Sequence, residues 1–257
     1  MSLNNFLKKV DPVVQKQYAM EKFKEGFSGR NFVVEEPEFK FEAPKFKRKL
    51  KLPKASENPG AAGYLTARKL NPDDFYFAKH FKKFANSLKP TFDTEDYDEE
   101  RIIIPLYYEK NLIGFQGRSL GPSKVKYITV MLDDDAPKIY GLDNIRRDAP
   151  VFITEGPFDS TFIPNSIAMC GADADISRWG ISNPVWIYDN EPRNKEITDR
   201  ISKTIDSGQS VVIWPDSIDD KDINDMVMSG LDVMSVIESN IYSGLEAKLK
   251  FTTWKKI

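Results

Sequence analysis

The stretch VFITEGPFDS, residues 151–160, runs from four apolar or β-branched residues directly into two carboxylates, Glu155 and Asp159. An apolar run of this length that ends at Gly and Pro predicts a short buried strand. Three further apolar runs follow it: SIAMC at 166–170, VWIYD at 185–189 and SVVIW at 210–214. Polar segments with helical signals separate these runs. The alternation predicts an α/β unit with a largely parallel sheet and helices on both faces.

The clearest helical signal lies in PRNKEITDRISKTIDSG, residues 192–208. Pro192 is expected in the first helical turn, and Gly208 is expected to end the helix. Between them, isoleucines at 197, 201 and 205 repeat every four residues. This spacing predicts one apolar helix face that packs on the sheet.

Acidic side chains follow three of the predicted strands. Glu155 follows the first strand, VFIT. Asp189 and Glu191 follow the apolar run VWIY at 185–188, and Asp222 lies in the acidic segment after the last strand. Ligands of open parallel sheets bind at the carboxyl ends of the strands, so these acids are expected to meet at one edge. Close carboxylate pairs repel by roughly a few kcal/mol, and a divalent cation removes that cost.

The predicted cation is hard, because its donors are oxygens only. We expect Mg²⁺, with Mn²⁺ as a substitute, and phosphoryl transfer as the reaction class. Two alternatives remain at this point. The acids at 159, 189 and 222 also precede helical segments and suit helix N-caps. Other acids lie within reach of the same cation, with Asp159 and Asp225 as secondary candidates.

Residue counts exclude several other kinds of site. Cys170 is the only cysteine and His80 the only histidine, so the chain offers no disulfide framework and no zinc site. We expect Cys170 to be packed in the core and His80 to be solvated. No signal-peptide pattern and no bilayer-spanning apolar run occurs, so we expect a cytoplasmic protein without a membrane partner.

Charge is unevenly distributed along the chain. Residues 1–90 carry 19 Lys and Arg against 10 Asp and Glu, and residues 91–257 carry 18 against 29. A basic front half predicts contact with an anion. It contains an expected helix near 13–27 and a stretch at 38–54 in which Lys alternates with Phe. This stretch fits either a single-strand-binding segment or a solvated linker.

The middle of the chain predicts helices followed by a small antiparallel sheet. A helical pattern covers 58–81 and is interrupted at Asn71 and Pro72. A charged surface loop is expected at 92–100. The expected strands are RIIIPLYY at 101–108 and LIGFQGRS at 112–119, joined as a hairpin by EKN, and then KYITV at 126–130.

Three motifs resemble the Toprim domain, whose pattern is Glu-Gly with a following Asp, then Asp-x-Asp, then an acidic motif with Lys-Asp. They are EGPFDS at 155–160, YDNE at 188–191 and KDIND at 221–225. Other segments resemble the basic subdomain and opening helix of bacterial and phage DNA primases: AAGYLTARKLNPDDF at 61–75, RIIIPLYYEKNLIGFQGRSLG at 101–121, KYI at 126–128 and YGL at 140–142. The resemblance covers about 58–240 in order, and it looks closest to primases of large tailed phages.

The resemblance implies an α/β Toprim fold, a mostly parallel sheet with flanking helices, preceded by a mixed α+β basic subdomain. The implied organisation is a basic, partly ordered extension at 1–57, a primase-type α+β subdomain at 58–148, the Toprim domain at 149–244 and a basic tail at 245–257.

The resemblance also implies a nucleotidyltransferase, a DNA-directed RNA polymerase that makes short primers on single-stranded DNA from ribonucleoside triphosphates. Glu155 would be a metal ligand or proton acceptor, and Asp189, Glu191 and Asp222 would hold Mg²⁺. The residues expected to face nucleotide or DNA phosphates are Arg101, Arg118, Lys126 and Lys138.

The sequence departs from the family pattern in two places. Glu191 stands where the second motif most often has Asp, and the Cys-rich zinc-binding domain that helps to choose start sites has no counterpart here. Template selection would then belong to another part of a longer protein, to a partner such as the replicative helicase of the infected host, or to the basic 38–54 segment. The alternative functions are a non-catalytic module that binds single-stranded DNA or helicase, and another Toprim enzyme such as a nuclease.

Overall fold

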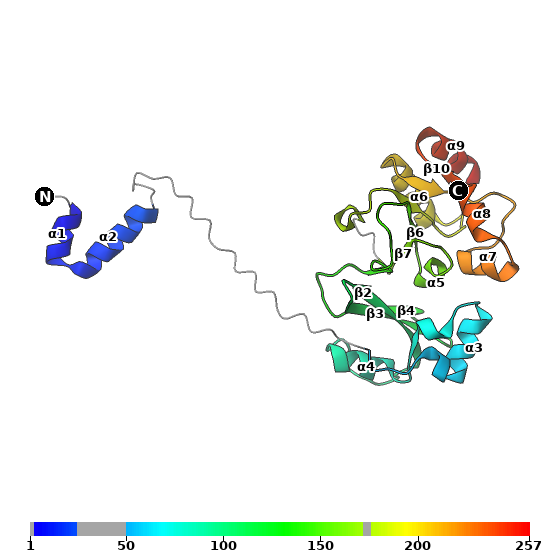
Figure 1. The fold of residues 1–257 in the computed structure, drawn as a ribbon, viewed down its shortest axis with the longest axis horizontal. Helices are drawn as coiled ribbons and strands as arrows, with labels where there is room; N and C mark the ends of the chain where they lie inside the picture. The colour runs from blue at the N-terminus through cyan, green and yellow to red at the C-terminus, as the bar shows by residue number, and fades with distance from the viewer. Residues whose placement is uncertain (1–2, 25–49, 172–175) are drawn as a thin grey trace. The chain divides into compact units, whose positions relative to one another are not determined.

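The computed structural model describes residues 3–24, 50–171 and 176–257 (Figure 1). The chain divides into two compact units, Met1–Lys45 and Phe46–Ile257. Most of the Lys-rich stretch at 38–54 lies outside the described residues, so its predicted role stays a prediction. In the described ranges, no helix is both long enough and apolar enough to cross a bilayer.

The first unit contains two helices, α1 (Leu3–Val10) and α2 (Pro12–Lys24). The Asp11 carboxylate between them accepts the main-chain N–H groups of Val13 at 2.9 Å and Val14 at 3.2 Å, which caps α2. The helix predicted near 13–27 is therefore confirmed as far as Lys24, and α1 was not predicted.

The second unit contains two sheets. The four-stranded sheet has the order β1-β2-β3-β4 and the six-stranded sheet the order β10-β9-β8-β6-β7-β5. The strands are β1 Tyr76–Ala78, β2 Arg101–Tyr108, β3 Asn111–Ser119, β4 Tyr127–Met131, β5 Ile139–Tyr140, β6 Val151–Thr154, β7 Ser166–Met169, β8 Pro184–Trp186, β9 Ser210–Val212 and β10 Ile241–Tyr242. The helices are α3 Pro59–Ala67, α4 Phe81–Leu88, α5 Pro157–Ser160, α6 Lys195–Asp206, α7 Ile223–Ser229, α8 Val233–Glu238 and α9 Gly244–Trp254, with 3₁₀ turns at Ala55–Glu57, Pro72–Asp74 and Ile176–Trp179.

The predicted hairpin is confirmed as β2 and β3, which pair antiparallel from Arg101 opposite Ser119. Its connection is the two residues Glu109 and Lys110, both with positive φ, in place of the expected EKN. Two-residue hairpin turns of this kind need positive φ at both positions. The Asp143 carboxylate accepts both of their N–H groups at 2.7 Å, which stabilises the left-handed backbone without glycine.

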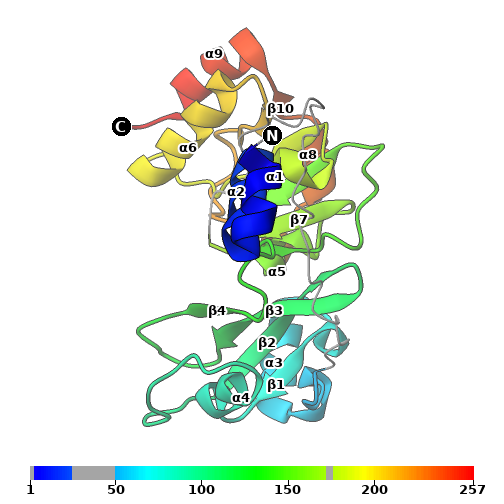
Figure 2. The same ribbon diagram turned by 90° about the vertical axis from the view of Figure 1, so that its left-hand side faces the viewer.

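The four-stranded sheet is covered on both faces. Ile102 and Ile104 of β2 pack with Leu65 of α3 and with α5, whereas Ile103 packs with Phe81 of α4. Figure 1 and Figure 2 show α3 and α4 beside this sheet, with α5 where the two sheets meet. Burial on both faces explains why RIIIPLYY is a continuous apolar run.

The helical prediction for 58–81 is only half right. Helix α3 ends at Ala67, and β1 occupies Tyr76–Ala78 before α4 begins at Phe81. The reason is a period-two pattern, since Phe75 and Phe77 are buried on either side of the half-buried Tyr76. The loop at 92–100 is confirmed, and its Asp98 carboxylate accepts the N–H groups of Lys82 and Lys83, which caps α4 after the exposed His80.

The six-stranded sheet is largely parallel, as predicted. Strands β9, β8, β6 and β7 run parallel, and the two edge strands, β10 and β5, are two residues long and antiparallel. Helix α6 buries the three predicted isoleucines, and Gly208 follows its end with φ of +77°. Pro192, however, precedes the helix, because Asn194 is the N-cap and its side chain accepts the Glu196 N–H at 3.0 Å.

The segment expected as a tail at 245–257 instead forms most of α9, which contacts α6 and β9. Ala247 and Trp254, seven residues apart, are both buried against the core, and Trp254 is 4% exposed. This spacing corresponds to two helical turns and gives α9 one inward face. Cys170 is buried in a separate apolar cluster with Leu106, Ile113 and Met131, so its predicted packing role is confirmed.

Candidate active site

A cavity of about 480 Å³ lies between the two sheets. The four-stranded sheet and its loop contribute Gln116, Lys126 and Tyr127 to the cavity wall. The six-stranded sheet contributes acids and bases, namely Glu155, Asp159, Asp189, Glu196, Arg200, Lys221 and Asp222. We call this second set, which has five acids and two bases, the acidic wall; the opposite side carries one base, Lys126.

The acidic wall forms at the carboxyl ends of parallel strands. Glu155 directly follows β6, and Asp159 lies in the short helix α5 that comes next. Asp189 lies three residues beyond β8, and Asp222 is the N-cap of α7 after β9. The structure thus brings together the acids of all three sequence motifs, as a parallel sheet requires.

Burial and neighbouring charges raise the pKa values of three of these acids. Burial, and then the neighbouring charges of Glu155, Asp159 and Asp222, raise the pKa of Asp189 to about 8. Burial and the Asp222 charge raise the pKa of Asp159 to about 7. Burial also raises the pKa of Glu155, although Arg200 works in the opposite direction. The pocket therefore disfavours the simultaneous ionisation of its carboxyl groups.

Glu155 is held from two sides. One carboxylate oxygen lies 3.2 Å from Arg200 Nη1, and the other accepts the Asp189 main-chain N–H at 3.4 Å. Glu191 is not part of the cavity wall and forms an ion pair with Lys221 at 3.2 Å. It therefore sits beside the acidic wall rather than in it.

Helix capping explains only part of the acidic cluster. Asp222 does cap α7, since its Oδ1 accepts the Asp225 N–H at 2.8 Å. Asp225 is exposed in the first turn of that helix. Asp189 caps no described helix, because Asn194 is the N-cap of α6. Capping alone therefore does not account for a buried carboxyl group at position 189.

The donor chemistry of the acidic wall suits a hard divalent cation. In the described part of the chain, no group of three or more His, Cys, Asp or Glu side chains is already arranged to hold a metal ion. The wall nevertheless offers carboxylate oxygens as its donors, and these are the ligands that a hard divalent cation prefers. The residues present fit such an ion by chemistry, without a preformed coordination shell.

Four basic residues were predicted to face phosphates, and three of them, Lys126, Arg118 and Lys138, lie in different environments. Lys126 lines the cavity, and burial followed by the charges of Arg118 and Arg68 lowers its pKa. Arg118 lies behind it, 6% exposed, with Nε donating to Tyr64 at 3.0 Å and its guanidinium over the Tyr127 ring. Lys138 is exposed and does not line the cavity.

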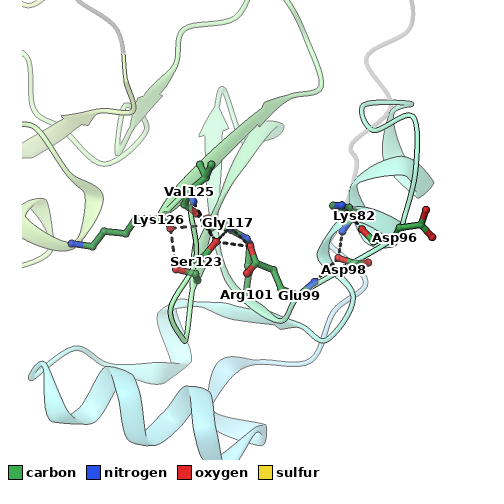
Figure 3. Close-up of polar contacts among 10 residues, drawn as sticks. Lys82, Asp96, Asp98, Glu99, Arg101, Gly117, Ser123, Val125 and Lys126 are labelled. Carbon is green, nitrogen blue, oxygen red and sulfur yellow. Dashed lines mark hydrogen bonds and ion pairs between the residues drawn. The ribbon is translucent and has the colours of Figure 1, made fainter.

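Arg101 has a different role from the predicted phosphate contact. Its side chain is fully buried and donates to the main-chain oxygens of Gly117 and Val125 at 2.7 Å and of Lys126 at 3.3 Å, as Figure 3 shows. It also forms an ion pair with Glu99. A guanidinium enclosed in this way cannot reach a nucleic acid; it fixes the loop that carries Lys126.

Sequence reasoning missed four charged residues at the site, the first of which is Glu196 at the cavity wall. Arg200 and Lys221 line the cavity, and Arg68 joins the two halves of the unit, with Nη1 donating to Asn224 Oδ1 at 2.7 Å and its carbonyl accepting from Asn224 Nδ2 at 2.8 Å. Lys221 lies inside the third acidic motif, which was a usable signal. Helix periodicity gave no reason to single out Arg200 on the polar side of α6.

Comparisons with known proteins identify the family and the fold. No protein-family model matches the chain. The chain is 32% identical, over 98% of its length and 78% of the relative's, to the DNA primase of Enterobacteria phage T4. Among solved structures, it resembles the DnaG primase catalytic domain bound to single-stranded DNA, with a TM-score of 0.56, 18% identity and coverage of 74% of this chain and 75% of that one. It also resembles the Aquifex aeolicus primase, zinc-binding and RNA polymerase domains, with a TM-score of 0.54, 19% identity and coverage of 73% of this chain and 57% of that one.

Proposed function

Because this chain belongs to the family of DNA primases, we propose that the cavity between its two sheets is the site of primer synthesis. A primase is a nucleotidyltransferase, and the predicted enzyme class and fold, a Toprim-type primase core, are confirmed by the relatives and the structural neighbours. The proposal concerns which residues act, with which metal ion, and on which partners.

The observation that carries the proposal is the opposition of charge across one cavity. Lys126 faces an acidic wall in which the pKa values of Asp159 and Asp189 are raised to about 7 and about 8. A nucleoside triphosphate carries negative charge that suits Lys126, with the charge of Arg118 close to it. A divalent cation on the acidic wall would neutralise the rest of that charge and polarise the reacting phosphate.

We assign the acids as follows. Glu155, Asp189 and Asp222 would hold the cation, which we propose to be Mg²⁺, with Mn²⁺ as a substitute and no role for zinc. Glu191, paired with Lys221, supports this wall from its edge. Glu155 is also suited to accept the proton of the attacking primer hydroxyl, because burial raises its pKa and makes it a stronger base than an ordinary carboxylate. The hydroxyl oxygen then bonds to the α-phosphorus and pyrophosphate leaves.

We assign the bases to the phosphates and the template. Lys126 would contact the triphosphate directly, since it lines the cavity. Arg118 would act from behind, by adding positive charge and by holding Tyr127 at the cavity wall. The exposed Lys138 remains a candidate for contact with the nucleic acid outside the cavity.

The proposed partners are single-stranded DNA and ribonucleoside triphosphates. One structural neighbour is the DnaG catalytic domain bound to single-stranded DNA, and the same kind of template suits a chain with a basic front half. A replicative helicase is a further proposed partner, with replication in the cytoplasm of an infected bacterial host as the setting. The compact units differ from the proposed division of the chain; we retain its boundaries at 57 and 148 as functional ones, and place 245–257 with the six-stranded sheet because α9 packs on α6 and β9.

The test is synthesis of RNA by the purified chain. Single-stranded template, labelled ribonucleotides and Mg²⁺, with and without helicase, should give short products. Template binding should weaken steeply with salt, in proportion to the phosphates neutralised. Binding without product under every condition would favour the non-catalytic module, and loss of template to short DNA fragments would favour a nuclease.

A further inference from the structure

We propose that the C-terminal helix α9 is part of the active-site framework, through a hydrogen bond from Trp254 to Asn190 that positions the acidic loops. This inference rests on the proposed function, because those loops carry the acids assigned to the metal ion. Asn190 lies between Asp189 and Glu191, yet its side chain is amide rather than acid. It is a positioning residue, and Trp254 is its partner.

Asn190 joins the second acidic motif to the third. Its Nδ2 donates to the carbonyl oxygens of Ile218 at 2.8 Å and Asp220 at 3.1 Å. Its main-chain N–H donates to the carbonyl oxygen of Lys221 at 2.6 Å. These three bonds connect the loop after β8 to the loop after β9. They end one residue before Asp222, so they set the distance between Asp189 and Asp222.

Trp254 fixes which way the Asn190 amide points. The indole Nε1–H donates to Asn190 Oδ1 at 3.1 Å, and the indole is 4% exposed. Turning the amide over would place its NH₂ group against the indole N–H and its oxygen against two carbonyl oxygens. Only one orientation satisfies all of these groups. A side chain from the last helix therefore determines how the two acidic loops are joined.

A second contact ties the same region to the end of the chain. The Lys256 main-chain N–H donates to the carbonyl oxygen of Pro192 at 3.0 Å, and its side-chain Nζ lies 3.3 Å from Asp216. Pro192 and Asp216 belong to the same two loops that Asn190 joins. Neither loop is helix or strand between 189 and 192 or between 215 and 221, so side-chain bonds provide much of their order.

The decisive experiment compares two tryptophans. Trp254→Phe removes an indole N–H from Asn190 and keeps an aromatic ring in the core. Trp186→Phe is the matched control, because Trp186 is also buried and donates its Nε1–H to a side-chain amide oxygen, Gln209 Oε1 at 2.6 Å. That bond lies in the same sheet but joins no acidic loop. Asn190→Ala completes a double-mutant cycle with Trp254→Phe.

We expect faster amide hydrogen exchange at 187–192 and 215–222 in Trp254→Phe and Asn190→Ala, and not in Trp186→Phe. Mn²⁺ affinity, measured by electron paramagnetic resonance without nucleotide, should fall about tenfold in Asn190→Ala, as for other residues that orient metal ligands. Trp254→Phe should weaken it in the same direction and add nothing in the Asn190→Ala background.

Two results separate this inference from the proposed function. If both variants keep wild-type exchange in these loops, or if Trp254→Phe and Trp186→Phe lower stability equally with unchanged exchange and Mn²⁺ affinity, the positioning role is wrong. If the wild-type chain binds no Mn²⁺, the metal assignment fails, and the hydrogen-exchange comparison still decides whether Trp254 and Asn190 order the loops.

Discussion

Replacing Arg101 by methionine should destabilise the protein and disable synthesis together. The guanidinium is fully buried and serves main-chain oxygens of β3 and of the loop that leads to β4, together with Glu99 (Figure 3). Methionine has a similar volume but no donors. The loop carrying Lys126 would then lose the bonds that hold it in place.

The size of the effect follows from the groups left without donors. The oxygens of Gly117 and Val125 each lose a hydrogen bond of 2.7 Å. An unsatisfied buried acceptor costs about 1–3 kcal/mol, which applies to the buried Gly117, whereas the Val125 oxygen keeps the bond from Ser123 Oγ at 3.2 Å. The Glu99 side chain is 38% exposed and can be rehydrated, so its contribution is smaller. We expect a loss of about 3 kcal/mol in the free energy of unfolding, measured by urea denaturation.

The matched control is Lys126→Met. Arg101 contacts only the main-chain oxygen of Lys126, so this variant should keep its stability to within about 0.5 kcal/mol while losing primer synthesis. Arg101→Met should lose both, assayed at a temperature where it remains folded. The reasoning is refuted if the free energy of unfolding of Arg101→Met lies within 1 kcal/mol of the wild-type value. It is also refuted if the folded variant makes primers at the wild-type rate.

Three further predictions concern the cavity and the sheet beside it. Glu155→Gln should abolish primer synthesis and leave single-strand binding near the wild-type value, because it removes an acid and no basic contact; equal loss of both in parallel synthesis and anisotropy assays would contradict the assignment. Asp159 and Asp189 have pKa values of about 7 and about 8 in the folded state and an ordinary value near 3.9 when unfolded, so the folded state binds more protons between these limits. In EDTA, the free energy of unfolding should therefore fall as the pH rises from 5 to 9, and Asp189→Asn should flatten that slope; a stability that rises with pH would be the wrong sign. Gly117→Ala would place a Cβ 2.3 Å from a Phe81 ring carbon and should cost about 1–3 kcal/mol in urea denaturation, whereas Gly121→Ala, with no atom within 4 Å of the new Cβ, should be nearly neutral.

The four parallel strands and the convergence of the acids could be predicted because each signal is local, whereas the order of the strands in the sheet and the short edge strands β5 and β10 were not predicted. Each of the four parallel strands is a short apolar run; the first two acidic motifs begin at the end of such a run, and the third follows its run after six residues. Parallel topology then brings Glu155, Asp189 and Asp222 to one edge whatever the details of the loops. The hairpin was equally readable, since two long apolar runs flank a polar connection.

The burial of charged side chains and the contacts between residues far apart in the sequence could not be predicted in the same way. The sequence shows that Arg101 is charged but not that β-strand neighbours enclose it, because those neighbours lie 16 to 25 residues away. Arg200 is one of several charged residues of α6. The periodicity of this helix predicts which residues face the core, but it does not predict which charged residue reaches the cavity. Trp254 resembled part of a solvated terminus until its bond to Asn190, 64 residues earlier, was visible.

The outer strands of the six-stranded sheet bear on how this protein behaves at high concentration. Both β5 and β10 are two residues long, so each presents very little unpaired backbone to which a strand of another molecule could add. Long, flat, exposed edge strands are the usual starting point for aggregation. Proteins avoid this by making their edge strands short. The strongly apolar interior strands could otherwise pair with strands of another molecule and start a fibril. The short edge strands keep them away from such pairing.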